Sequence, residues 1–218
     1  MINVLFQGDS ITDVGRRRGE ELPSRALGQG YPTMVAGHLS AHRSDVNFYN
    51  RAVAGNRISD IYGRWLEDAV NLDFDVLSIL AGINDVGFQL RLGRGSDNER
   101  FRFIYDRMLY EAKESHPDAK LILLEPFVIR YRFSWEPFGT DIYDNYETWA
   151  EKTREKGAVV KDLAKKYDAV FVPLFDKLAT LAENNPERYT EDGVHPTTVG
   201  HSVITGEWLK AWESLGLS

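Results

Sequence analysis

A serine near the start of the chain, and an aspartate and a histidine near its end, are residues that together could form a nucleophilic site. Ser10 follows an apolar run in Gly8-Asp9-Ser10, and Asp192 stands three residues before His195 in a loop marked by glycine and proline. A serine hydroxyl is a weak nucleophile unless a histidine removes its proton and an acid orients that histidine. The pattern predicts Ser10 as the nucleophile, His195 as the base and Asp192 as the carboxylate that accepts the Nδ1–H of His195.

Attack of a hydroxyl on a carbonyl also needs hydrogen-bond donors for the negative oxygen that develops. Gly55 has no side chain to block its backbone N–H, and Asn84 carries an amide NH₂. Each follows an apolar run, as Ser10 does. We therefore expect an oxyanion hole formed by the backbone N–H groups of Ser10 and Gly55 and by the side chain of Asn84.

Five short apolar runs, which we interpret as strands, must position these residues. They cover residues 2–7, 46–50, 74–80, 120–125 and 169–173. Amphipathic stretches at residues 30–42, 57–70, 97–115, 145–167 and 197–215 alternate with them and predict helices, with a further short helix at 175–183. Strands that alternate with crossover helices are typical of a three-layer α/β/α fold with a parallel sheet. Ligands of such sheets bind beyond the carboxyl ends of the strands.

Length and charge narrow the class of protein. The chain has 218 residues with no internal repeat or low-complexity tract, so we expect one domain over residues 1–218. Its formal net charge of −7 repels phosphate backbones and anionic lipids, which excludes nucleic acid and membrane surfaces as expected partners. The absence of cysteine excludes disulfides, thiolate metal sites and cysteine nucleophiles.

The start of the chain bears on the compartment. Its first residues lack the basic start of a signal sequence, and no apolar stretch reaches the ~18 residues that a membrane-spanning helix needs. We therefore expect a cytoplasmic protein.

Four segments resemble the four sequence blocks of the SGNH (GDSL-type) hydrolases, in order and at comparable spacing. They are Gly8-Asp9-Ser10-Ile11-Thr12-Asp13, Gly55, Gly82-Ile83-Asn84-Asp85 and Asp192-Gly193-Val194-His195-Pro196. One departure is that Ile11 stands where the family name has leucine. A single block occurs by chance, but four in sequence, each after an expected strand or in an expected catalytic loop, form a specific signal.

The resemblance implies a flavodoxin-like five-stranded parallel sheet and hydrolysis of an ester through an acyl-enzyme. It implies a Ser10–His195–Asp192 triad, an oxyanion hole from Ser10, Gly55 and Asn84, and neither a metal nor an organic cofactor. Within the family, the chain looks most like the intracellular acetyl esterases that act on xylan-derived or related sugars. The expected substrate is an acetylated sugar or oligosaccharide.

Aromatic residues are concentrated after the fourth expected strand. Between residues 131 and 149, seven of 19 positions are aromatic, against 12% for the whole chain. Flat aromatic side chains stack on sugar rings, but they also anchor protein interfaces. Both roles stay open for this segment, with Tyr131, Trp135 and Tyr143 as the expected substrate-binding residues and a homo-oligomer as the expected assembly.

Other functions remain open from the residues alone. The same mechanism serves a lysophospholipase or an acyl-thioesterase, and a relative that has lost catalysis would only bind carbohydrate. A phospho-acceptor domain, with Asp9 at the end of the first strand, lacks evident acidic and lysine partners. His201, six residues after His195, is interpreted as a packing or solvent-facing residue.

Overall fold

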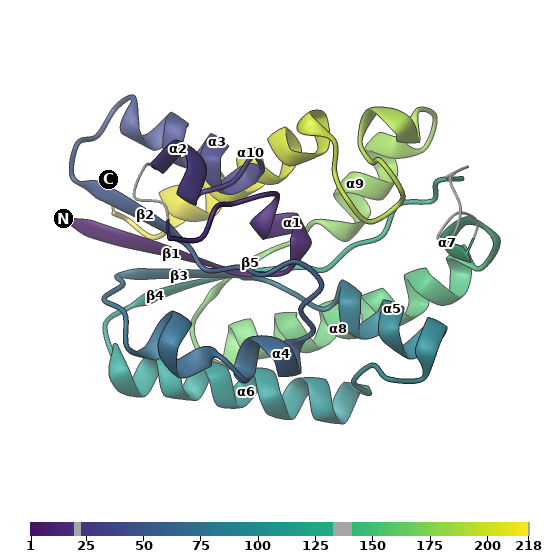
Figure 1. Cartoon of the computed structure of the whole chain (residues 1–218), viewed down its shortest axis with the longest axis horizontal. Coiled ribbons are helices and arrows are strands. Elements are labelled where there is room, and N and C mark those ends of the chain that lie inside the picture. The colour runs from purple at the N-terminus through teal and green to yellow at the C-terminus, as the bar shows by residue number, and fades with distance from the viewer. Residues whose placement is uncertain (20–22, 133–140, 218) are drawn as a thin grey trace.

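A sheet of five parallel strands forms the centre of the protein (Figure 1). The computed structural model describes residues 1–19, 23–132 and 141–217. The strands are β1 (Ile2–Gly8), β2 (Val46–Asn50), β3 (Val76–Leu80), β4 (Lys120–Leu124) and β5 (Val170–Val172). They lie in the order β2-β1-β3-β4-β5, and every neighbouring pair is parallel. The predicted parallel sheet is confirmed.

Helices cover both faces of this sheet, which confirms the three layers (Figure 1). The helical elements are α1 (Ser10–Asp13), α2 (Pro23–Ala26), α3 (Tyr31–Ser40), α4 (Ile58–Tyr62), the π-helical turn η1 (Leu66–Val70), α5 (Ile83–Leu92), α6 (Asn98–Ser115), α7 (Asp141–Asp144), α8 (Tyr146–Lys166), α9 (Phe175–Ala182), the 3-10 turn η2 (Pro186–Arg188) and α10 (Thr198–Ser214). Helices α3 and α10 lie on one side of the sheet, and α4, α6 and α8 lie on the other.

The strands are apolar along their whole length because both of their faces are buried. Successive side chains of a strand point to opposite faces, so β1 sends Val4 and Phe6 into the core beneath α3 and α10, and Leu5 into the core against α4 and α6. In β3, the side chains of Val76 and Leu77 likewise point into the cores on opposite faces of the sheet. The continuous apolar runs of the sequence are thus explained by the helical layers that cover the sheet.

The sequence pattern missed one substantial helix, α5, which begins directly behind β3. Asn84, Asp85 and Gly87 are weak helix formers, so the segment lacks a helical signature of its own. Packing stabilises it instead. Gly87 brings α5 close to α8, because a Cβ at this position would come within 3.1 Å of the Trp149 ring.

The long amphipathic stretch 57–70 is not one helix. It forms α4, and then η1 after a short break. Arg64 lies in that break, and its side chain donates hydrogen bonds to Gln7 of β1 and to the carbonyl oxygen of Arg51 after β2. No helix in the described ranges is both long and apolar enough to cross a membrane.

Candidate active site

The carboxyl ends of β1, β2 and β3 lie next to one another, because β1 is the strand between the other two. The chain leaves β1 through Gly8 in very close contact with β3: a Cβ on Gly8 would lie 2.4 Å from the carbonyl oxygen of Leu80 and 2.6 Å from Oγ1 of Thr12. Only glycine fits such an approach. This glycine sets the position of the two residues that follow it.

Asp9 fixes the start of α1, whose first residue is Ser10. Its Oδ1 accepts a hydrogen bond from the backbone N–H of Ile11 at 3.0 Å, which caps the helix. The carboxyl is fully buried, and its Oδ2 has no hydrogen-bond partner in the described part of the chain. Burial raises the pKa of Asp9 to about 7, although the Ile11 hydrogen bond and His195 act to lower it.

Ser10, His195 and Asp192 form one chain of hydrogen bonds. Oγ of Ser10 lies 2.9 Å from Nε2 of His195, and Nδ1 of His195 lies 2.6 Å from Oδ2 of Asp192. An ionised carboxylate only accepts hydrogen bonds, so neutral His195 carries its proton on Nδ1. Its Nε2 then accepts from the Ser10 hydroxyl. The structure therefore brings these three predicted residues together, across 185 positions of sequence.

The pair of His195 and Asp192 perturbs the pKa of both partners. The hydrogen bond to Asp192 raises the pKa of His195 above its ordinary value of 6.5, although burial opposes this. For Asp192, burial pulls the pKa upward, but the hydrogen bond from His195 outweighs it and the net shift is downward. Asp192 is thus held ionised, and it stabilises a positive charge on the imidazole.

The loop that carries Asp192 and His195 is fixed by its own backbone. Oδ1 of Asp192 accepts the backbone N–H groups of Val194 at 2.9 Å and His195 at 2.8 Å, which closes a tight turn. Gly193 donates to Oγ1 of Thr190 at 2.9 Å. A positive φ of 96° and close contact with the segment after β4 require glycine at position 193.

The two further donor candidates follow β2 and β3. Gly55 lies in residues 51–56, which we call the β2 loop, and has a φ of 79° that favours glycine. Asn84 is the second residue of α5, and its Nδ2 donates to the carbonyl oxygen of Asn56 at 3.1 Å. The side chain of Asn84 therefore contacts the loop that carries Gly55.

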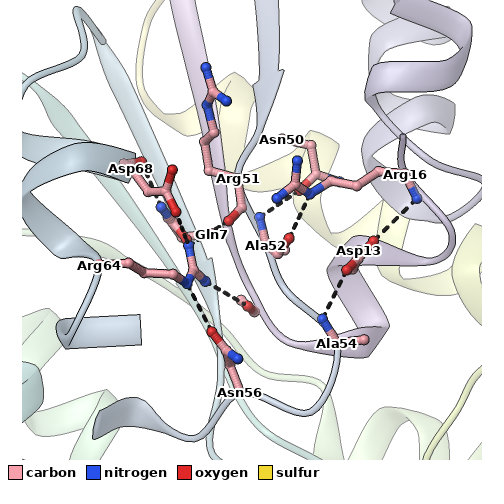
Figure 2. A network of polar contacts seen from close by, with 11 residues as sticks. Gln7, Asp13, Arg16, Asn50, Arg51, Ala52, Ala54, Asn56, Arg64 and Asp68 are labelled. Carbon is pink, nitrogen blue, oxygen red and sulfur yellow. Dashed lines mark hydrogen bonds and ion pairs between the residues drawn. The ribbon is translucent and has the colours of Figure 1, made fainter. Parts of the chain in front are cut away.

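One set of polar side chains holds the β2 loop from the α1 side (Figure 2). Oδ2 of Asp13 accepts the backbone N–H of Ala54 at 2.8 Å. Nε of Arg16 donates to the carbonyl of Ala52 at 2.6 Å, and Oδ1 of Asn50 accepts the N–H of the same residue at 3.0 Å. These bonds fix the loop on both sides of its midpoint.

Arg64 holds the β2 loop from the opposite side (Figure 2). Its Nη1 donates to the carbonyl oxygen of Arg51 at 2.6 Å, to Oε1 of Gln7 at 3.1 Å and to Oδ2 of Asp68 at 2.8 Å. Its Nε donates to Oδ1 of Asn56 at 2.8 Å. A single guanidinium thus joins both ends of the loop to β1 and η1.

A buried carboxyl links the starts of α4 and α5. Oδ2 of Asp85 accepts the backbone N–H of Ile58 at 2.9 Å, while its Oδ1 has no partner among the described residues. Burial raises the pKa of Asp85 to about 6, against the lowering effect of the Ile58 hydrogen bond and of nearby Lys156. Asp85 adjoins Asn84, so this bond also fixes the position of that side chain.

A hollow of about 670 Å³ opens over Ser10 and His195. Its described lining mixes apolar groups with charged and polar side chains, among them Arg16, Arg18, Glu191 and His201. Sequence reasoning assigned no site role of their own to Asp13, Arg16, Arg64 and His201, because the partners that place them there are distant in sequence.

The predicted aromatic binding residues stand apart from this lining. The described residues around the hollow include neither Tyr131 nor Tyr143. Instead, the guanidinium of Arg132 lies over the Tyr143 ring, 4.2 Å from the centroid of that ring. Trp135 lies outside the described residues. The substrate-binding role of all three stays a prediction.

Comparisons with known proteins agree with this geometry. Residues 6–203 match the model of the GDSL-like lipase/acylhydrolase family. The chain is 32% identical over 217 residues to an acetylxylan esterase from Geobacillus stearothermophilus, with 95% of this chain and 92% of the relative covered.

Solved structures show the same fold. A GDSL-like protein from Parabacteroides merdae superposes with a TM-score of 0.86 at 30% identity, over 96% of this chain and 94% of that one. The acetylxylan esterase Axe2 from Geobacillus stearothermophilus superposes with a TM-score of 0.81 at 29% identity, over 96% and 93%. The resemblance that the four sequence blocks predicted is confirmed, and the chain belongs to the GDSL-like lipase/acylhydrolase family of carboxylic ester hydrolases.

Proposed function

We propose that this enzyme hydrolyses small acyl esters, in particular acetyl esters of sugars or oligosaccharides such as xylan fragments. The observation that carries the proposal is the continuous hydrogen-bond chain from Oγ of Ser10 through His195 to Asp192, at 2.9 Å and 2.6 Å. The similarity to an acetylxylan esterase over nearly the whole chain supports the choice of substrate.

In the proposed mechanism, Oγ of Ser10 attacks the ester carbonyl while Nε2 of His195 takes the hydroxyl proton. Asp192 stabilises the imidazolium that forms. The same imidazolium then protonates the leaving alcohol, and an acyl-enzyme remains on Ser10. Water, deprotonated by His195, attacks this ester and releases the carboxylic acid.

The negative oxygen of each tetrahedral intermediate is stabilised by the N–H groups of Ser10 and Gly55 and by Nδ2 of Asn84. An amide NH₂ has two protons, so Asn84 can donate one to Asn56 and keep the other for the substrate. Donors that are already in place when charge develops are the most effective, since no reorganisation is needed. The bonds that fix the β2 loop supply this rigidity.

The lining of the hollow favours short acyl groups. Its described side chains include two arginines and a glutamate, which a long apolar chain would have to desolvate. A lysophospholipase or acyl-thioesterase of the same family is the alternative, and a non-catalytic carbohydrate-binding relative is a more remote one. A homo-oligomer and a cytoplasmic location stay predictions.

Substitution of the nucleophile tests the mechanism directly. Ser10→Ala removes the attacking oxygen, so hydrolysis of 4-nitrophenyl acetate should fall at least about a thousandfold with an unchanged circular dichroism spectrum. Ser115→Ala, at an exposed serine on α6, is the matched control and should keep the wild-type rate. Near-normal activity of Ser10→Ala would show that another group is the nucleophile.

Acyl-chain length separates the proposed function from its alternative. With 4-nitrophenyl acetate, butyrate and octanoate, kcat/KM should be highest for the acetate, because a longer acyl chain would have to desolvate the charged side chains of the lining. A rate that rises steadily with chain length would favour the lysophospholipase or acyl-thioesterase function. Failure of Ser10 to react with a serine-directed phosphonate would favour the non-catalytic relative.

The pH dependence should report the state of His195, which must be neutral to take the serine proton. Because Asp192 raises the pKa of His195, activity should fall with decreasing pH along a limb centred above pH 6.5. Asp192→Asn removes the raising interaction, so this limb should move to lower pH while the maximal rate falls about a thousandfold or more. Rates measured from about pH 5 to about pH 9 decide this, and a limb that does not move in the variant contradicts the assigned role of Asp192.

Loss of Arg64 should disturb the β2 loop without removing the nucleophile. Arg64→Met leaves the carbonyl of Arg51 and the side chain of Asn56 without their donor, so kcat should fall roughly 10- to 100-fold with little change in KM. Arg107→Met, at an exposed arginine paired with Glu111, is the control. Melting temperatures of both variants verify folding, and an unchanged kcat in folded Arg64→Met would remove Arg64 from the positioning of the oxyanion donors.

A further inference from the structure

His201 lies in the hollow above the proposed nucleophile, although its place in the sequence suggests only packing. It is in the first turn of α10, it is 3% exposed, and it lines the same hollow as Ser10 and His195. The close approach of α10 to the loop before it requires Gly200, where a Cβ would lie 2.3 Å from the carbonyl oxygen of Tyr189. His201 is thus held at the site by the backbone around it.

The hydrogen bond at one ring nitrogen fixes the tautomer of His201. Its Nδ1 lies 3.2 Å from the backbone nitrogen of Tyr31, the first residue of α3. This N–H is one of the helix-start donors without an acceptor inside the helix. A backbone N–H can only donate, so Nδ1 must carry the lone pair. Neutral His201 therefore has its proton on Nε2.

The ring is also fixed in orientation and kept neutral. It stacks on the Tyr31 ring, with centroids 6.5 Å apart and an interplanar angle of 22°. Gly30 leaves room for it, since a Cβ there would lie 3.0 Å from Cε1 of the imidazole. Burial, with a smaller effect of His195, lowers the pKa of His201 to about 4. The pKa of His201 is therefore lowered, whereas the pKa of His195 is raised.

The Nε2–H of His201 remains available to a ligand. Among the described residues, the hydrogen bond of the His201 ring is made by Nδ1, and Nε2 has no partner. The fully buried side-chain atoms that lack a partner in this part of the chain belong to Asp9, Asp85, Tyr105, Trp149 and Thr153. Nε2 of His201 is not one of them, so this atom is not fully buried. This nitrogen is therefore a fixed, neutral donor that keeps access to the hollow.

We propose that His201 is a specificity-determining residue, whose Nε2–H donates a hydrogen bond to a hydroxyl or ring oxygen of the sugar that leaves as the alcohol. The inference rests on the proposed esterase function. The leaving oxygen must lie beside Nε2 of His195, which protonates it. His201 lines the same hollow as His195, whereas the proposed donors for the acyl oxygen follow β1, β2 and β3.

Two acetate esters separate this role from a merely structural one. His201→Phe keeps a flat ring but loses both nitrogens, so kcat/KM for an acetylated methyl xyloside should fall about tenfold, the scale of one hydrogen bond. The same variant should keep 4-nitrophenyl acetate hydrolysis within about twofold, because that alcohol has no hydroxyl for this donor. Ser202→Ala, at the exposed neighbouring position, is the control and should change neither rate.

The other outcomes overturn the inference. An equal loss on both esters would mean that His201 only supports the fold, and no loss on the xyloside would mean that it does not contact the sugar. If the wild-type enzyme hydrolyses neither ester, the proposed function itself is wrong and this inference fails with it.

A second measurement decides the question if His201→Phe does not fold. In ¹⁵N-histidine-labelled Ser10→Ala, which retains His201, nuclear magnetic resonance should show the Nε2–H tautomer for this ring. Addition of the acetylated methyl xyloside should shift the Nε2 resonance, and ethyl acetate should leave it in place. An Nδ1–H tautomer, or identical shifts with both esters, overturns the inference.

Discussion

The common direction of the five strands is the constraint on which the site depends. Parallel strands must all end at the same edge of the sheet, so the segments that follow β1, β2 and β3 meet there whatever their separation in sequence. The helix layers make this arrangement stable by burying both faces of every central strand. The 2.9 Å contact between Ser10 and His195 follows from this geometry, since the last loop returns to the same edge before α10 begins.

The parts of the structure with a local signal could be predicted from the sequence. Apolar runs identified the strands, and four short blocks indicated the residues that gather at their ends. The position of Arg64 could not be predicted, because an arginine in an amphipathic stretch has the pattern of a solvated side chain. Its acceptors belong to Gln7 and to a distant loop, and only the folded chain brings them within reach. The same holds for His201, whose partner Tyr31 is 170 positions away.

Electrostatics at the site differ from those of the molecule as a whole. The chain carries a net charge of −7, yet Arg16 and Arg18 line the hollow and Arg64 lies behind the adjacent loop. The guanidinium of Arg16 donates to the backbone carbonyl of Ala52. Arginine suits this task because its planar fork can join several oxygen atoms at once. Composition describes the average surface, while these local groups determine what a substrate meets.

The two buried carboxyls, Asp9 and Asp85, couple folding to proton uptake. Each has a pKa well above the ordinary value of 3.8, at about 7 and about 6, so the folded chain holds protons that the unfolded chain has already released. Their contribution to the unfolding free energy is complete below pH 3.8 and is lost as the pH rises through these two values. Because both carboxyls sit directly beside the residues that form the site, mild acidity strengthens the scaffold under the very conditions that protonate His195. The stability that these two carboxyls contribute and the activity that needs neutral His195 therefore respond to acid in opposite directions.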